Sequence, residues 1–448
     1  MAVWGCHPAS QRLTRIRTLR KGQPLHETAH HLPSVFDVAA ILISLAALLS
    51  WINHKLLKLP STVGLALMGA VASLIVLGVD LATPNILIGD AIRDFMSGID
   101  FETALMDGML SFLLFAGALH VDMTDLRRHW AQVGVLSTIG VLASTIIVGF
   151  GLSLITSLAG IDVPLIWCLL FGALISPTDP VAVLGAMKHS RTPPGLQATI
   201  AGESLFNDGV GVVLFSILAS LAASGADFSA PEAASLFFIE AVGGAAMGLA
   251  AGFIGYFAMK AIDDYAVELL ITLAIVMGGY ALSQYIHVSG PVAMAVAGLL
   301  IGNRGVAHAM SDTTRDHVIK FWGLVDEVLN AVLFLLIGLE GIVLLGTVQF
   351  LLIGLAAIPL VMAARAISVG APLALWRRSL PFATTFPVMV WGGLRGGISI
   401  ALALSLPAGD AKDLLVTATY VVVLFSVLIQ GSTVSQVIAR ASGPTPAS

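Results

Sequence analysis

A short polar segment, GESLFNDGVG, spans residues 202–211 beside the apolar run VVLFSILASLAA. Ser204 and Asp208 are four residues apart, so they share one face if the segment is helical. Glu203 and Asn207 form a second pair at the same spacing. An ionisable group at the centre of a bilayer costs about 2.5–3.5 kcal/mol even on the lenient insertion scale, so these acids predict a functional site. Carboxylate and hydroxyl oxygens suit a hard cation.

A second polar segment, SPTDPVAV at residues 176–183, carries two prolines that flank Thr178 and Asp179. Each proline removes an amide donor and disfavours the helical conformation at the preceding residue. The pattern predicts a broken helix, which membrane proteins tolerate where the backbone is buried or lines a water-filled cavity. The freed carbonyls, the Thr178 hydroxyl and the Asp179 carboxylate could then hold a small cation. A simple proline kink with a capping aspartate is the alternative.

Two arginines also lie within apolar runs. Four glycines surround Arg395 in WGGLRGGISIALAL, at residues 391–404, and predict a second unwound helix. Arg395 could neutralise either helix-end carbonyls or Asp179. Arg365 lies in the middle of LVMAARAISV, and a buried guanidinium requires an anion. We predict Glu203 as its partner.

Smaller residues suggest how these helices pack. Gly202, Gly209 and Gly211 would let the backbone of another helix approach closely. Asn330, in LNAVLFLLIGLE, is predicted to form an interhelical hydrogen bond rather than an ion contact.

The elements that position these residues follow from composition. The 448 residues are 57% hydrophobic and 11% charged, whereas a soluble domain has about 25% charged residues. Apolar stretches recur along the chain and predict a polytopic all-α membrane protein without a large soluble catalytic domain. The segment 84–98 is too polar to span a membrane, and Cys6 and Cys168 give no disulfide framework. We predict thirteen spans, at 36–53, 61–79, 103–120, 131–157, 163–187, 198–222, 233–259, 265–286, 289–302, 318–343, 346–375, 382–406 and 413–438.

Basic residues predict the orientation, because cytoplasmic loops are enriched in Lys and Arg. With a cytoplasmic C-terminus, only Arg93 and Lys412 fall in outer loops. The predicted cytoplasmic side then carries Lys55, Lys58, Arg127, Arg128, Lys188, Arg191, Lys260, Arg304, Arg315, Lys320, Arg377, Arg378 and Arg440. Residues 1–33 are basic but would lie outside, so we expect a disordered tail or a misannotated start. The transmembrane domain would cover 34–440 and a short cytoplasmic tail 441–448.

The interrupted spans occupy matching positions. Span five is the middle of spans four to six, and span twelve is the middle of spans eleven to thirteen. The two units are offset by seven spans, so they would cross the membrane in opposite senses. Interrupted helices at matching positions of inverted repeats indicate the midplane site of a secondary transporter.

At these motifs the sequence resembles the monovalent cation/proton antiporters of the sodium/hydrogen exchanger class, of the bacterial Na⁺/H⁺ type. TDP, ESLFND, FLLIGLE and GGLRGGISIALAL match that family in order and spacing, and the resemblance covers roughly 35–438. It implies thirteen helices and two inverted repeats whose broken helices cross at spans five and twelve. It also implies a core bundle of spans 4–6 and 11–13. A homodimer in the inner membrane would be built on spans 1–3 and 7–10.

The resemblance also implies roles for individual residues. Asp208 would bind the cation or the proton. Na⁺ would be held at Asp208, Thr178 and Ser204. Asn207 and the backbone near Asp179 would complete the site.

Further positions concern charge balance and access. Glu203 and Arg365 would form a structural ion pair, while Arg395 would offset helix-end charge. Many relatives carry an acid near the end of span three, where this chain has Ala116 and His120.

The expected function is exchange of Na⁺, or of Li⁺ or K⁺, for H⁺ by alternating access at one carboxylate. Because Asn207 beside Asp208 cannot ionise, we predict electroneutral one-for-one exchange. The transported ions and the lipid bilayer would be the partners, with no cofactor and no nucleic acid. The alternatives are a K⁺/H⁺ antiporter and a cation channel, although no repeated carbonyl filter motif is present. A membrane enzyme would require a nucleophile or a metal cluster, and the sequence has no HExxH motif.

Overall fold

The computed structural model describes residues 35–82, 109–187, 190, 192, 195–224, 230–306, 309–344, 348–375 and 381–441. Several sequence predictions fall outside these ranges. They are the tail 1–33, the polar segment 84–98, the C-terminal tail beyond Ala441, and the basic positions Arg93, Lys188, Arg191, Arg377 and Arg378.

The described residues form helices joined by short connections, with no β-strand among them. The labels η1, η3 and η4 mark short π-helical segments. In chain order the elements are α1 (Val35–Ile52), η1 (Asn53–Leu57), α2 (Ser61–Ala82), α5 (Leu110–Leu119), α6 (Met123–Ser137), α7 (Ile139–Leu158), α8 (Leu165–Ile175), α9 (Val181–Met187), α10 (Leu196–Ser224), α11 (Ala230–Lys260), α12 (Tyr265–Tyr285), α13 (Gly290–Leu300), η3 (Ile301–Gly305), α15 (Asp312–Leu344), α16 (Val348–Leu375), α17 (Phe382–Trp391), α18 (Gly397–Leu404), α19 (Asp410–Phe425), η4 (Ser426–Gln430) and α20 (Gly431–Ala441).

The prediction of an all-α polytopic membrane fold is confirmed. Each of the thirteen predicted ranges contains a helix in its described part. Among the described residues, eight helices are long and apolar enough to cross a membrane, and shorter apolar helices lie between them. A helix suits this environment because it satisfies its backbone hydrogen bonds internally, where lipid offers no partners. The count of thirteen spans stays a prediction.

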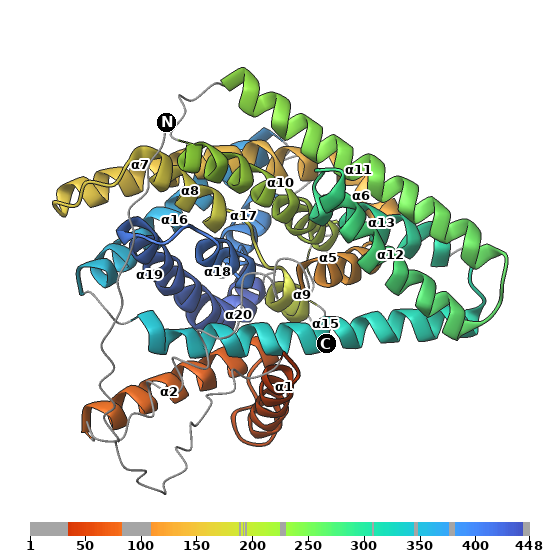
Figure 1. Cartoon of the computed structure of the whole chain (residues 1–448), viewed down its shortest axis with the longest axis horizontal. Coiled ribbons are helices and arrows are strands. Elements are labelled where there is room, and N and C mark those ends of the chain that lie inside the picture. Colours follow the sequence, from red (N-terminus) through yellow and green to blue (C-terminus); the bar gives the residue numbers. More distant parts are fainter. Residues whose placement is uncertain are drawn as a thin grey trace, which may run out of the picture.

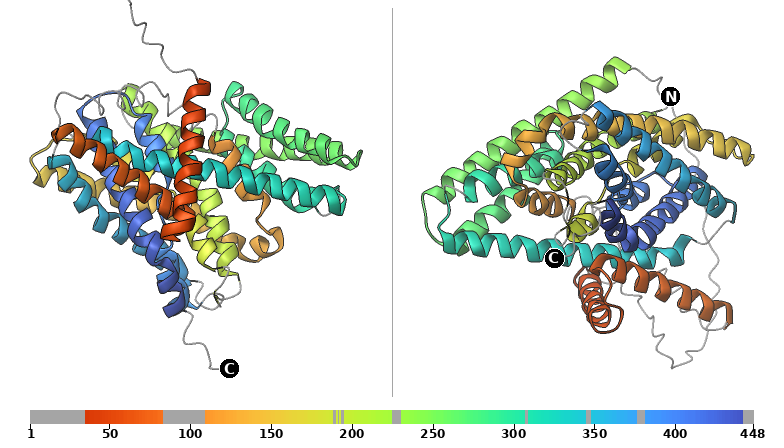
Figure 2. Two further views of the ribbon diagram at one scale, coloured as in Figure 1. Left: turned by 90° about the horizontal axis from the view of Figure 1, so that it is seen from below. Right: turned by 180° about the vertical axis from the view of Figure 1, so that it is seen from behind.

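The helices gather in two groups (Figure 1). Helices α7, α8 and α16 to α20 lie together on one side, and α11 to α13 lie on the other, with α10 between them. Helix α15 runs along one edge of both groups. Helices α1 and α2 lie on the outer side of α15, as the view from behind also shows (Figure 2).

Two of the predicted spans are interrupted where the sequence indicates. Helix α8 ends at Ile175 and α9 begins at Val181, so the prolines of SPTDP lie in a non-helical segment. The Asp179 carboxylate accepts a hydrogen bond from the Val181 amide at 2.8 Å and thereby satisfies a free donor at the start of α9. Helix α17 ends at Trp391, and α18 begins at Gly397, after the glycine-rich stretch around Arg395.

Two packing predictions are wrong in detail. At the three glycines of α10, a Cβ atom would first meet a side chain rather than another backbone, namely Leu126 at Gly202, Val292 at Gly209 and Pro177 at Gly211. Side chains from α6, α13 and the segment between α8 and α9 therefore pack against these glycines. Asn330 donates to Asp326 Oδ1 at 3.1 Å within α15, because the two residues are one helical turn apart. It forms no hydrogen bond to another described helix.

Candidate functional site

The two interrupted helices meet at their breaks. The Asp179 amide donates a hydrogen bond to the Leu394 carbonyl at 2.8 Å. The ideal Cβ position at Gly396 lies 3.0 Å from both Cβ and Oδ2 of Asp179, so a side chain there would press on this carboxylate. Segments far apart in the sequence thus form one non-helical region inside the protein.

Arg395 supports this region from the second break. Its Nη1 donates to the carbonyls of Ser176, at 2.5 Å, and Pro177, at 2.9 Å. These carbonyls follow the C-terminal end of α8, where the helix dipole is negative and the broken ladder leaves acceptors free. The sequence left open whether Arg395 would serve helix-end carbonyls or Asp179, and the hydrogen bonds place it on the carbonyls. Its own amide donates to Ser426 Oγ at 2.8 Å.

Thr178 is the centre of a buried polar cluster that joins the first break to α10. Asn207 Nδ2 donates to Thr178 Oγ1 at 2.8 Å, and the Thr178 amide donates to Asn207 Oδ1 at 3.3 Å. Thr178 Oγ1 also lies 3.1 Å from Ser204 Oγ, in a hydrogen bond where either hydroxyl can donate. All three side chains are buried. Ser204 and Asn207 are about one helical turn apart on α10, so both side chains can reach Thr178.

Asp208 follows Asn207 directly and has a different environment. It is 7% exposed, and no described residue donates a hydrogen bond to its carboxylate or forms an ion pair with it. Asp179 lies near enough to repel it electrostatically. A buried carboxylate without a counter-charge is costly, so this arrangement favours a state in which the group holds a proton or a cation. Ser204, one helical turn before Asp208 on α10, carries a hydroxyl oxygen of the kind that suits a hard cation.

Glu203 is neutralised by a basic partner. Nη1 of Arg365 donates to Oε1 of Glu203, and Nη2 donates to Oε2 at 3.0 Å, which makes a bidentate pair. The same guanidinium donates from Nε and Nη2 to the Met389 carbonyl, at 3.3 and 3.1 Å. The pair therefore links α10, α16 and α17, and both side chains are buried.

Sequence reasoning missed three contributors to this region. The Ser426 hydroxyl, at the start of η4, accepts from the backbone amide of Arg395, and the Met389 carbonyl, on α17, accepts from the Arg365 guanidinium. Asp326, on α15, lies near enough to act electrostatically on Asp179. Only Asp326 has a sequence signal, because it precedes Asn330 by one helical turn in an apolar run. The backbone carbonyl has none.

The chain is similar to known proteins over most of its length. The family model described as "Sodium/hydrogen exchanger, transmembrane" matches residues 42–440. The Na(+)/H(+) antiporter NhaP of Pseudomonas aeruginosa is 45% identical over 414 residues, which cover 91% of this chain and 97% of the relative. The Na(+)/H(+) antiporter NhaH of Halobacillus dabanensis is 32% identical over 392 residues, which cover 86% of this chain and 93% of the relative.

A solved structure has the same fold. The sodium proton antiporter MjNhaP1 from Methanocaldococcus jannaschii superposes with a TM-score of 0.70 at 22% sequence identity. The match covers 90% of this chain and 98% of that one. The likeness in fold therefore extends over nearly the whole chain.

Proposed function

The chain belongs to the sodium/hydrogen exchanger family, and from that membership we propose that it is a secondary active antiporter that exchanges Na⁺ for H⁺. The 45% identical relative from Pseudomonas aeruginosa is named a Na(+)/H(+) antiporter and supports this ion pair. No cofactor enters the proposal, because the ion gradients supply the free energy. The work of the protein is to bind one ion at a time and to change the side from which the site is reached.

The observation that carries the proposal is the position of Asp208 beside the Thr178 cluster. The Asp208 carboxylate is buried without a counter-charge, whereas the neighbouring acid Glu203 is paired with Arg365. Asp208 is therefore the proposed exchange site, where a proton and Na⁺ compete for one carboxylate. Oxygens of Thr178 and Ser204 are proposed further ligands for Na⁺.

The remaining polar residues have proposed supporting roles. Asn207 holds Thr178 in place through its two hydrogen bonds, and the Asp179 region supplies backbone oxygens. Arg395 offsets the charge of the α8 carbonyls, so the break persists whether or not a cation is bound. Glu203 and Arg365 fix α10 against α16 and α17.

Alternating access is proposed to occur by movement of one bundle against the other. The moving unit would be spans 4–6 and 11–13, which carry both breaks and Asp208. Spans 1–3 and 7–10 would form the interface of a homodimer in the inner membrane, with the C-terminus cytoplasmic. This division is supported by the separation of α16 to α20 from α11 to α13 (Figure 1).

The test is transport in proteoliposomes that contain the purified protein and a trapped pH dye. The vesicles start with an outward proton gradient, which the dye reports. This gradient should dissipate when Na⁺ is added, at a rate that saturates with Na⁺ concentration. Li⁺ and K⁺ are added in separate runs to rank the cations. Flux that does not saturate, or cation flux without proton movement, would contradict antiport and indicate a channel.

A further inference from the structure

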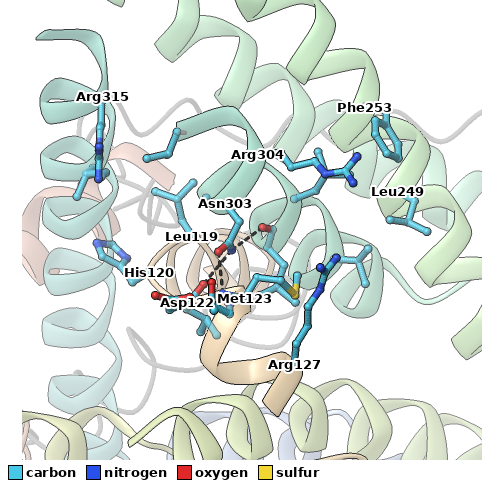
Figure 3. Close-up of a pocket in the computed structure, with 18 of the residues that line it drawn as sticks. Leu119, His120, Asp122, Met123, Arg127, Leu249, Phe253, Asn303, Arg304 and Arg315 are labelled. Atoms are coloured by element: carbon cyan, nitrogen blue, oxygen red, sulfur yellow. Dashed lines mark hydrogen bonds between the residues drawn. The ribbon is translucent and has the colours of Figure 1, made fainter. Parts of the chain in front are cut away.

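A cavity of about 1090 Å³ is lined by residues that do not belong to the Thr178 cluster (Figure 3). Its wall includes the turn that joins α5 to α6 and the segment η3, which follows α13. The start of α15 completes the wall. None of the proposed cation-site residues lines this cavity, so the cavity requires an explanation of its own.

The polar part of the lining is strongly basic. Arg127 and Arg128 come from α6, Arg304 from η3 and Arg315 from α15. Within the described part of the chain, none of these four arginines forms an ion pair. Among the described residues of the lining, Asp122 carries the one carboxylate, so their formal charge is +3 with His120 neutral. A cation would be repelled here, and an anion would be attracted.

The acid in the lining, Asp122, already accepts a hydrogen bond from the protein backbone. Asp122 Oδ1 accepts a hydrogen bond from the Thr124 amide at 2.6 Å, which caps α6 and lowers the pKa of Asp122. Asn303 Oδ1 accepts from the Met123 amide at 2.7 Å, and its Nδ2 donates to the Val121 carbonyl at 2.9 Å (Figure 3). The first amides of α6 are thus occupied, so an anion would be bound by the arginines.

The other part of the lining is apolar and reaches the outer face of α11. Leu249 and Phe253 of α11 line the cavity, and the Arg304 guanidinium lies 5.8 Å from the centre of the Phe253 ring. Leu249 is 46% exposed, and the same helix exposes Ile254 and Phe257. The cavity therefore joins a set of guanidinium groups to a hydrophobic surface of a membrane helix.

We propose that this cavity binds a phosphate-bearing anion, attracted by the guanidinium groups of Arg127, Arg304 and Arg315 in its wall. A guanidinium suits this chemistry because its planar fork can donate two parallel hydrogen bonds to phosphate oxygens. Free phosphate and a phospholipid headgroup share this group. The apolar wall on α11 favours the phospholipid, whose acyl chains would cover it. Basic pockets between membrane helices are a known means of binding anionic headgroups.

Occupancy would affect transport, a consequence that rests on the proposed function. Arg127 lies on α6, in the unit proposed to move, whereas Arg304 and Arg315 lie on elements of the other unit. A phosphate held between them would resist relative movement of the two units. Binding itself requires no ion gradient, so its test is independent of antiport.

The experiment uses the full chain, purified and delipidated in a neutral detergent. Native mass spectrometry measures retention of phosphatidylglycerol, with phosphatidylcholine as the zwitterionic comparison. A thermal melt with added inorganic phosphate forms the second arm. Arg304→Ala and Arg315→Ala should each weaken phosphatidylglycerol binding roughly fivefold, the effect of about 1 kcal/mol for each basic residue. Arg440→Ala is the matched control, because Arg440 is exposed on α20 and lies outside the lining.

The outcomes distinguish a phospholipid headgroup from free phosphate as the bound anion. Phosphatidylglycerol retention that depends on Arg304 and Arg315 but not on Arg440 supports the lipid. Stabilisation by inorganic phosphate with the same dependence, without lipid retention, supports free phosphate. Unchanged binding in both cavity variants, or an equal loss in Arg440→Ala, overturns the site. If an alanine variant does not fold, Arg304→Lys replaces it and should weaken binding while retaining the charge. Competition between phosphate and phosphatidylglycerol for the unaltered protein tests the shared site without any substitution. Absence of competition would count against the site.

Discussion

Asn207 makes two hydrogen bonds to Thr178, one from its Nδ2 to the threonine Oγ1 at 2.8 Å and one to its Oδ1 from the threonine amide at 3.3 Å. This contact ties the middle of α10 to the break between α8 and α9. The amide side chain is suited to it because it offers a donor and an acceptor at once. Asn207 thus has a structural task besides leaving Asp208 as the one ionisable residue of the adjacent pair.

Asn207→Ala should therefore reduce both stability and transport. The loss of both contacts leaves the buried Thr178 groups with fewer partners, and we expect a cost of about 1–3 kcal/mol. Thermal melts and Na⁺-driven dequenching on the same preparations measure the two effects. Gln349→Ala is the control, because it removes an exposed amide side chain that bonds to the Ala159 carbonyl. Equal effects of the two variants would refute a special role for the Thr178 contact.

Asp208→Asn should abolish exchange while the protein remains folded. The substitution removes the group that would carry the proton, and it breaks no hydrogen bond that a described residue donates. The measurement is proton flux driven by Na⁺, with the melting curve as a check on folding. Asp316→Asn is the matched control, since Asp316 lies exposed on α15 in a pair with Lys320. A folded Asp208→Asn protein that transports at the unaltered rate would remove Asp208 from the site.

Glu203→Gln should act mainly on stability. It leaves the Arg365 guanidinium buried without its carboxylate, and broken buried pairs cost about 3–5 kcal/mol. Combining it with Arg365→Met removes the orphaned charge and should recover part of the loss. The comparison of single and double variants by thermal melting forms a double-mutant cycle. Simple additivity would show that the pair contributes no coupling energy.

Exchange should be electroneutral, with one proton for each cation. Of the acids on α10, only Asp208 would titrate in the cycle, because Asn207 cannot ionise and Glu203 is held by Arg365. No net charge then crosses, so a membrane potential leaves the ion distribution at equilibrium unchanged. The test sets a K⁺ and valinomycin potential across proteoliposomes, after K⁺ has been excluded as a substrate. A null point that shifts with voltage would reveal a second transported proton, with Glu203 as the first residue to replace.

The sequence alone determined the class of fold and the positions of the two breaks. Apolar runs of membrane-spanning length form helices whatever their neighbours, and the prolines of SPTDP remove backbone donors locally. The glycines around Arg395 act in the same local way. The buried acids could also be recognised, because an ionisable residue within an apolar run is unusual by itself. These features depend on residues close together in the chain.

The sequence predicted the pairing of Glu203 with Arg365, but only the tertiary structure decided the other partners. Arg395 serves the carbonyls of Ser176 and Pro177 rather than Asp179, and Ser204 and Asn207, on neighbouring faces of α10, both reach Thr178. The sequence predicts the arginines of the anion cavity on one side of the membrane, but it gives no reason to expect them around one cavity, because they lie on three elements. The physical reason is that a hydrogen bond or an ion pair between distant segments depends on how the helices pack. Side-chain type and spacing specify which groups need a partner, and packing determines which partner comes within reach.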